Sequence, residues 1–279
     1  MACATAAFVR PARRVGAGAG PRAEHDNLRW IDPFRRARGR ALRLIDPFNE
    51  RSRSVLVLGF PVGPLQANCY VIARGEGEPC VIVDPGQDAA DPVREQVRKH
   101  GLVPEGVLLT HGHFDHVLSA GPVAAEHGCP AWVHPEDRYM LDDPGAALGP
   151  AGKQLFGDGP APHVPDDVRD IADGEVLDVA GMQFEITHSP GHTGGSVLFA
   201  TGTEEGGRLL LAGDTLFAGA IGRTDLPGGD HAQMLRSLSA LLPLDDDTVV
   251  LPGHGPTTTI GRERASNPFL QELPAPDAF

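Results

Sequence analysis

The segment LLTHGHFDHV, residues 108–117, places three histidines and one aspartate within six positions, directly after an apolar run. Imidazole and carboxylate groups are ligands that suit zinc, iron and manganese in proteins. A catalytic zinc ion takes three protein ligands and keeps a further position open for water. These four side chains therefore predict a metal site with more ligands than a single ion uses.

Three later loops carry the same kinds of side chain beside a glycine, each after an apolar run. Loops at the ends of strands commonly carry binding residues, and glycine lets the backbone turn sharply or approach an ion closely. The complete set of candidate ligands is His111, His113, Asp115, His116, His192, Asp214 and His254. Seven ligands exceed the need of one ion and suit two ions that share one bridging carboxylate.

Further residues near these loops are candidates for supporting roles. Asp84, in VDPG, is interpreted in two ways: it forms a turn, or it accepts a hydrogen bond that orients a ligand histidine. His134 and His188 also end apolar runs and are candidates for a supporting or structural role. The other histidines are interpreted as ordinary surface or core residues: His25, His100, His127, His163 and His231.

The segments that must position these loops alternate regularly from Val55 onwards. Short β-branched runs bounded by Gly, Pro or Asn predict strands, and capped stretches with an apolar stripe predict helices. The predicted strands cover residues 55–60, 69–73, 80–84, 106–111, 131–134, 182–188, 195–200, 208–214 and 248–255. The predicted helices cover residues 91–101, 116–127 and 231–242, and residues 141–168 are predicted to be irregular. Strands that first follow one another and then alternate with helices indicate a layered α/β architecture.

The charge distribution divides the chain of 279 residues into two parts. Of its 24 basic and 37 acidic residues, twelve arginines and five acids lie in residues 1–54, so the remainder is strongly acidic. The basic part also lacks periodic apolar runs. We predict an Arg-rich, disordered N-terminal extension over residues 1–53 and one folded domain over residues 54–279. The acidic domain argues against sequence-independent binding of nucleic acid, which needs a basic surface.

The extension contains the repeat LRWIDPF (28–34) and LRLIDPF (42–48), whose two copies are too few for a solenoid. Residues 1–23 are rich in Arg and Ala and free of acids, which leaves organellar targeting as an alternative to a plain extension. The four cysteines form no CxxC pair, and no apolar run approaches the ~18 residues of a membrane span. The sequence therefore predicts a cytoplasmic protein without a membrane segment.

The motifs THGHFDH, SPGHTGGS, AGDTLF and PGHG, in this order, resemble the metallo-β-lactamase-fold hydrolases over about residues 55–270. The resemblance implies an α/β fold, a four-layer αβ/βα sandwich in which two mixed β-sheets are flanked by helices. It also implies two divalent metal ions, with zinc as the first expectation and iron or manganese as alternatives. The implied ligand groups are His111, His113 and His192 for one ion, Asp115, His116 and His254 for the other, and Asp214 as the bridge.

Within that superfamily, residues 213–230 and 252–270 are similar to the short bacterial glyoxalase II-like group. This similarity implies hydrolysis of a small-molecule thioester, S-D-lactoylglutathione or another glutathione thioester. A hydroxide that bridges the two metal ions would attack the thioester carbonyl, and Asp115 would act as a catalytic residue that both ligates and orients it. Long glyoxalase II carries a C-terminal helical domain that grips glutathione, whereas only 25 residues follow His254 here.

Arg223, in GRTD, is interpreted in two ways. Its guanidinium could anchor a glutathione carboxylate through two hydrogen bonds, or it could pair with Asp225 and brace the loop, which is the favoured interpretation. Both interpretations concern the loop that follows Asp214.

Three alternative functions stay open. A persulfide dioxygenase of the same superfamily would hold one iron at His111, His192 and Asp214, but PGHGP and TDLPGG stand where that group has HDY and a Phe-Gln pair. A β-lactamase or lactonase is the second alternative, and no secretory signal of the kind a secreted β-lactamase needs is visible. The third belongs to another class, a metal-binding partner protein without turnover.

Overall fold

The structure, a computed structural model, describes residues 40–43, 55–150, 152, 154, 163–203 and 206–273. Most of the predicted extension, including residues 1–23 and the first copy of the repeat, lies outside the described residues, so its disorder and targeting role stay predictions. One short piece of it, Arg40–Arg43, forms strand β1 and pairs antiparallel with β2. Among the described residues, no helix is both long and apolar enough to cross a membrane.

The first sheet has seven strands in sequence order, from β1 to β7. Strands β1 to β4 pair antiparallel, whereas β4 to β7 pair in parallel. The strands are β2 Leu56–Val62, β3 Ala67–Ala73, β4 Pro79–Val83, β5 Val103–Leu108, β6 Ala131–Val133 and β7 Val168–Asp170. Parallel strands need a crossover connection, and α1 (Ala90–His100) and α3 (Ala120–His127) supply two of them.

The second sheet has six strands in the order β15-β14-β11-β10-β9-β8. Only β11 and β14 pair in parallel, so this sheet is also mixed. The strands are β8 Val176–Val179, β9 Met182–His188, β10 Val197–Gly202, β11 Arg208–Gly213, β14 Val249–Pro252 and β15 Thr258–Thr259. A two-stranded hairpin, β12 (Leu216–Phe217) and β13 (Ala220–Ile221), follows β11.

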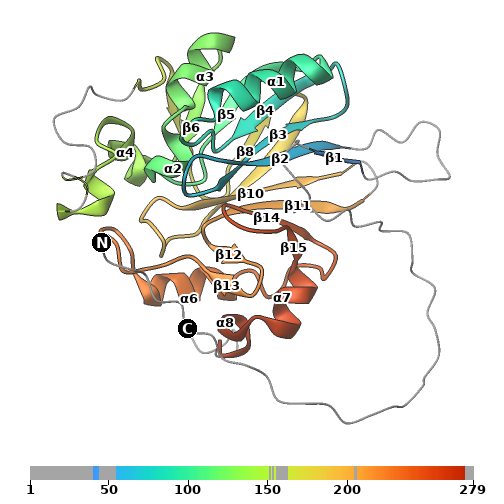
Figure 1. Cartoon of the computed structure of the whole chain (residues 1–279). Coiled ribbons are helices and arrows are strands. Elements are labelled where there is room, and N and C mark those ends of the chain that lie inside the picture. Colours follow the sequence, from blue (N-terminus) through green and yellow to red (C-terminus); the bar gives the residue numbers. More distant parts are fainter. Residues whose placement is uncertain are drawn as a thin grey trace. The chain divides into compact units, whose positions relative to one another are not determined.

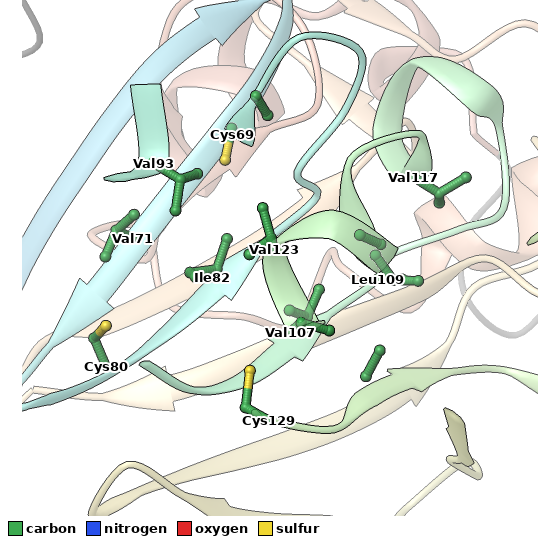
Figure 2. Packing of buried hydrophobic residues seen from close by; sticks show 14 of the residues in the cluster. Cys69, Val71, Cys80, Ile82, Val93, Val107, Leu109, Val117, Val123 and Cys129 are labelled. Carbon is green, nitrogen blue, oxygen red and sulfur yellow. The ribbon is translucent and has the colours of Figure 1, made fainter. Parts of the chain in front are cut away.

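Alternation along the strands divides the buried residues into three clusters. On β3, Tyr70 and Ile72 face the second sheet and pack in the same cluster as Phe184 and Phe199, because successive side chains of a strand point to opposite faces. Val71 faces the other way, and Figure 2 shows it among residues of β4, β5 and the helices α1 and α3. The outer face of the second sheet packs against α6 His231–Ser239, α7 Ile260–Ser266 and α8 Pro268–Gln271.

These clusters define four layers, with α1 and α3 outside the first sheet and α6, α7 and α8 outside the second (Figure 1). The predicted αβ/βα sandwich is therefore confirmed. Every predicted strand overlaps an observed strand, with ends that differ by up to three residues, as in β5 and β14. The helix predicted over residues 116–127 is wrong as a single element, because it is divided into α2 (Phe114–Val117) and α3. Pro122 lacks an N–H and would collide with the carbonyl four residues earlier, at Leu118, where the helix breaks.

The segment predicted to be irregular, residues 141–168, also departs from that prediction at both ends. It contains the end of α4, Tyr139–Asp142, a 3₁₀ turn over Ala146–Leu148, and the first residue of β7. Strands of two to four residues such as β8, β12, β13 and β15 carry too few side chains for an alternating pattern to register. Helices α7 and α8 are capped at their N-termini by Thr259 and Asn267, whose side chains accept hydrogen bonds from the backbone N–H groups of Arg262 and Phe269.

Candidate metal centre

The loops that follow β5, β9, β11 and β14 bring all seven predicted ligands together. Two groups of three each offer one ligand atom per residue, all within 4.8 Å of one another. We call His111, His113 and His192 the histidine triad, and Asp115, His116 and His254 the acidic triad. The predicted division of six ligands into two groups matches the grouping in space.

The histidine triad is buried and holds imidazoles alone. Nδ1 of His113 lies 2.8 Å from Nε2 of His192, and the ring of His111 meets both other rings edge-on at 4.8–4.9 Å between centroids. Burial and the neighbouring imidazoles lower the pKa of His113 to about 3 and lower the pKa of His111 well below its usual value. Both rings are therefore neutral at neutral pH, which is the form that binds a metal.

The acidic triad has the opposite electrostatic character. Nε2 of His254 lies 3.3 Å from Oδ2 of Asp115, and Nε2 of His116 lies 3.7 Å from the same oxygen. Burial alone would lower the pKa of His116, but the carboxylates of Asp214, Asp84 and Asp115 outweigh it and raise that pKa to about 10. For Asp115, burial acts to raise the pKa, but the hydrogen bond and charge of His254 and the charge of His116 hold it well below its usual range.

Asp214 lies between the two triads. Its Oδ2 is 3.4 Å from Nε2 of His192 and 3.7 Å from Nε2 of His254, and its Oδ1 is 3.5 Å from Nε2 of His116. The backbone of Gly253 passes so close that a Cβ there would lie 2.1 Å from Oδ1, so this approach requires glycine. Asp214 is the one carboxylate among the seven ligands that touches both triads, as a bridging ligand must.

Three buried polar atoms of this cluster have no hydrogen-bond partner: Nε2 of His111, Nε2 of His113 and Oδ1 of Asp214. Leaving a buried polar atom unsatisfied costs roughly 1–3 kcal/mol, and such atoms are rare in folded proteins. Three of them in one cluster, all on side chains of the types that bind metals, fit divalent cations at this position. The residues present therefore suit the metal that their chemistry predicts.

Asp84 lies where its second interpretation puts it, beside a ligand histidine. Its Oδ2 lies 3.1 Å from Nδ1 of His116, and its two oxygens accept hydrogen bonds from the backbone N–H and the hydroxyl of Thr110 at 2.8 and 2.6 Å. Asp84 also forms a ligand-like triad with His111 and His116. Because both its oxygens already accept hydrogen bonds, we assign it to orienting His116 rather than to holding an ion.

Two other histidines are oriented through Nδ1 in the same way. The hydroxyl of Thr110 lies 3.1 Å from Nδ1 of His111, and the backbone carbonyl oxygen of Arg223 lies 2.8 Å from Nδ1 of His192. A proton on Nδ1 leaves Nε2 as the free ligand atom of each ring. The sequence did not indicate the contact of Arg223, because a backbone carbonyl is common to every residue type.

The side chain of Arg223 pairs with Asp225, as the favoured interpretation predicts. The guanidinium donates hydrogen bonds of 2.7 and 2.8 Å to the two carboxylate oxygens, and both side chains are exposed. The pair lies on the loop whose carbonyl oxygen contacts Nδ1 of His192, so bracing of this loop stays the favoured interpretation. The charge of Arg223 also contributes, as a minor cause, to the low pKa of His113.

The loop of His254 is tied to the first sheet by two side chains that the sequence did not indicate. The side-chain amide of Asn68 donates to the carbonyl oxygens of Pro252 and Gly255, both at 2.9 Å. The hydroxyl of Tyr70 donates to the carbonyl oxygen of Pro252 at 2.8 Å. Both residues lie on β3, so this end of the acidic triad depends on contact between the two sheets.

The remaining histidines take no part in the two triads. His134 and His188 stack with ring centroids 4.3 Å apart, and Nε2 of His188 lies 2.7 Å from the carbonyl oxygen of Gly194, next to the loop of His192. Their position fits a supporting role. Within the described part of the chain, none of the histidines outside the two triads belongs to a group that could hold a metal ion, and His25 lies outside that part.

Comparisons with known proteins agree with this geometry. The profile of the metallo-beta-lactamase superfamily (Lactamase_B) matches residues 62–254. An uncharacterized protein of Mycobacterium tuberculosis is 50% identical over 78% of this chain and 99% of its own length. Hydroxyacylglutathione hydrolase GloC of Haemophilus influenzae is 38% identical over 75% of this chain and 95% of its own length.

Two solved structures are similar over most of their length. One is BLEG-1, a B3 metallo-beta-lactamase, with 37% identity and a TM-score of 0.66 over 76% of this chain and 98% of the other. The second is TTHA1623 in a di-iron-bound form, with 38% identity and a TM-score of 0.64 over 76% of this chain and 99% of the other.

Proposed function

Because the chain belongs to the metallo-beta-lactamase superfamily, we propose that it is a metal-dependent hydrolase that cleaves a glutathione thioester, S-D-lactoylglutathione or a related hydroxyacylglutathione. The observation that carries the substrate class is the similarity to the hydroxyacylglutathione hydrolase of Haemophilus influenzae over nearly its full length. The buried cluster of imidazoles and carboxylates supports the hydrolytic chemistry, since such ligands suit a catalytic metal centre.

The proposed centre holds two divalent ions, one at the histidine triad and one at the acidic triad, with Asp214 between them. The unpartnered buried polar atoms on the side chains of His111, His113 and Asp214 support this occupancy. Zinc suits the ligand set, and the similarity to a protein in a di-iron-bound form makes iron the first alternative, followed by manganese. Two such ions supply a water-derived nucleophile at neutral pH and polarise the carbonyl that it attacks.

The protein's own groups position the reaction. Asp115 is ionised at neutral pH because its pKa is held low, so its carboxylate can accept a hydrogen bond from the attacking water and hold it toward the carbonyl carbon. As the new C–O bond forms, the C–S bond breaks and its electron pair stays on the sulfur. A thiol has a pKa of about 8.5, so the thiolate leaves without a strong general acid.

The experiment that tests this proposal is a paired assay on the purified, metal-analysed protein. We expect hydrolysis of S-D-lactoylglutathione that is lost with a chelator and restored by added zinc or iron. Oxygen consumption with glutathione persulfide, and no thioester hydrolysis, would replace the proposal with the persulfide dioxygenase. Bound metal without turnover of either substrate would indicate the metal-binding partner protein.

A second candidate function is hydrolysis of a β-lactam amide, which the similarity to a B3 metallo-beta-lactamase favours. The same water-derived nucleophile would attack a lactam carbonyl, but the leaving group would be an amine, which needs a proton that a thiolate does not. A chromogenic cephalosporin added to the paired assay tests it. Turnover of the cephalosporin with a higher kcat/KM than of the thioester would favour the second candidate.

A further inference from the structure

Asp137 is a fully buried acid that the proposed reaction does not use. It lies in a short 3₁₀ turn, Pro135–Asp137, that follows β6, and its relative exposure is 0%. Burying a carboxyl group is costly unless hydrogen bonds replace the lost water. The groups that replace this water come from two of the ligand loops.

The two oxygens of Asp137 join the loop after β5 to the loop after β9. Oδ2 accepts the backbone N–H of Gly112 at 2.8 Å and the hydroxyl of Thr193 at 2.6 Å. Oδ1 accepts the backbone N–H of Gly195 at 2.8 Å. Gly112 stands between His111 and His113, and Thr193 follows His192. One carboxylate therefore spans the gap between the segments that carry the whole histidine triad.

The backbone around Gly195 is shaped to admit this carboxylate. A Cβ at Gly195 would lie 2.7 Å from Oδ1, Cγ and the backbone nitrogen of Asp137, which real Cβ atoms essentially never do. This close approach explains the second glycine of the HTGGS segment. The two loops also share a backbone hydrogen bond from Val197 N–H to the carbonyl oxygen of Thr110 at 2.8 Å, but that bond lies outside the segments between the ligands.

We propose that Asp137 is the positioning residue of the histidine triad, and that its carboxylate fixes the separation at which His111, His113 and His192 receive a divalent ion. The inference rests on the proposed metal centre and assigns the residue to one half of it. None of the hydrogen bonds of Asp137 reaches the acidic triad, so its loss weakens one ion and spares the other.

The variant Asp137→Asn tests this assignment, since it keeps the size of the side chain and removes one acceptor oxygen. Either orientation of the amide sets its NH₂ against a backbone N–H, at Gly112 or at Gly195, so one of the two loops is released. We expect the dissociation constant of one metal equivalent to rise about 10–100-fold, which is typical for loss of a group that orients metal ligands. The second equivalent keeps its wild-type affinity.

The two equivalents are identified by reference variants in a zinc titration of the chelator-stripped protein. His192→Ala removes a ligand of the histidine triad and His254→Ala removes a ligand of the acidic triad. Glu263→Gln is the matched control, because Glu263 is also buried and its carboxylate accepts hydrogen bonds from Gly219, between β12 and β13, and from Thr258 on β15, rather than from the two segments that Asp137 joins. We expect Glu263→Gln to lower the stability of the fold and to leave the affinity of both zinc equivalents unchanged.

The inference stands if Asp137→Asn weakens the equivalent that depends on His192 and spares the one that depends on His254. It is overturned if both equivalents bind as in wild type, if both weaken alike, or if wild type holds one equivalent that does not depend on His192. Should Asp137→Asn fail to fold, Thr193→Val removes the hydroxyl bond alone and must weaken the same equivalent. Since metal affinity is measured, absence of thioester hydrolysis would overturn the proposed function and leave this inference intact.

Discussion

The two halves of the candidate metal centre share the loop after β5 and differ in the protonation of the histidines on it. His113 and His116 are three positions apart and almost equally buried, yet the pKa of His113 is lowered to about 3 and that of His116 is raised to about 10. Burial disfavours the charged form of both rings. The difference therefore comes from their neighbours, which are imidazoles around His113 and the carboxylates of Asp84, Asp115 and Asp214 around His116.

Because of this difference, a metal ion would meet different protonation states in the two halves. The histidine triad presents neutral rings and is ready to bind a cation at neutral pH. In the acidic triad the carboxylates hold a proton on His116, so a metal ion must displace that proton before it binds. The buried carboxylates that support the two halves also differ. Asp137 contacts backbone N–H groups of the loops that carry the histidine triad, whereas Asp84 contacts the imidazole ring of His116 itself.

Removing the carboxylate shared by the two halves should have the largest effect. Asp214→Ala takes away the oxygens that lie 3.4–3.7 Å from ligand nitrogens of both triads. We expect kcat/KM for the thioester to fall about 10³-fold, since several kcal/mol of charge stabilisation depend on the metal pair. Metal content should drop below two equivalents. Asp178→Ala, an exposed acid on β8, is the control, and full activity with two equivalents in Asp214→Ala would refute the shared site.

Removing the carboxylate that orients His116 should affect the acidic half alone. Asp84→Asn keeps the turn but offers one acceptor oxygen where Thr110 and His116 need two. We expect the equivalent that depends on His254 to bind about 10–100-fold more weakly, and the equivalent that depends on His192 to bind as before. A zinc titration measures this. Equal weakening of both equivalents would show that the two halves are not separately supported.

The contrast in pKa predicts a maximum in the stability of the metal-free protein near pH 6.5. The folded pKa of His116, about 10, exceeds its unfolded value of about 6.5, so its stabilisation is complete below pH 6.5 and is lost as the pH rises toward 10. The folded pKa of His113, about 3, lies below its unfolded value, so stability is also lost as the pH falls from 6.5 toward 3.

Thermal unfolding in chelator between pH 5 and 9 measures this curve. Added zinc should remove the alkaline decline, because binding requires the deprotonated ring of His116 and releases its proton. His116→Gln should flatten the alkaline side of the metal-free curve and leave the acid side. A melting temperature of the metal-free wild type that rises steadily from pH 6.5 to 9 would contradict the raised pKa.

The sequence indicated which residues gather at the candidate centre better than it indicated the groups that support them, for a physical reason. His111, His192 and the other candidate ligands offer side chains whose chemistry is visible in the residue type, on loops that follow apolar strands. Asp137 accepts from backbone N–H groups 25 and 58 positions away, and every residue except proline has such a group. The backbone carbonyl of Arg223 is likewise a group that every residue type carries, so the residue type does not indicate its contact with His192. The break between α2 and α3 has a local cause in the sequence, namely Pro122. Two-residue strands such as β12 have no comparable local signal in the sequence.

The smallest effect is expected at the exposed pair beside the histidine half. Arg223→Ala should leave the melting temperature and both metal equivalents nearly unchanged, since an exposed ion pair contributes little stability and the carbonyl that holds His192 is kept. If the guanidinium only braces the loop, Asp225→Asn and Arg223→Ala change KM and kcat alike by a few-fold at most. If it also binds a substrate carboxylate, Arg223→Ala raises KM while Asp225→Asn, which frees the guanidinium, lowers it. Opposite shifts in KM would make Arg223 a substrate-binding residue whose guanidinium is paired with Asp225 until substrate binds. Parallel shifts would limit its role to bracing the loop.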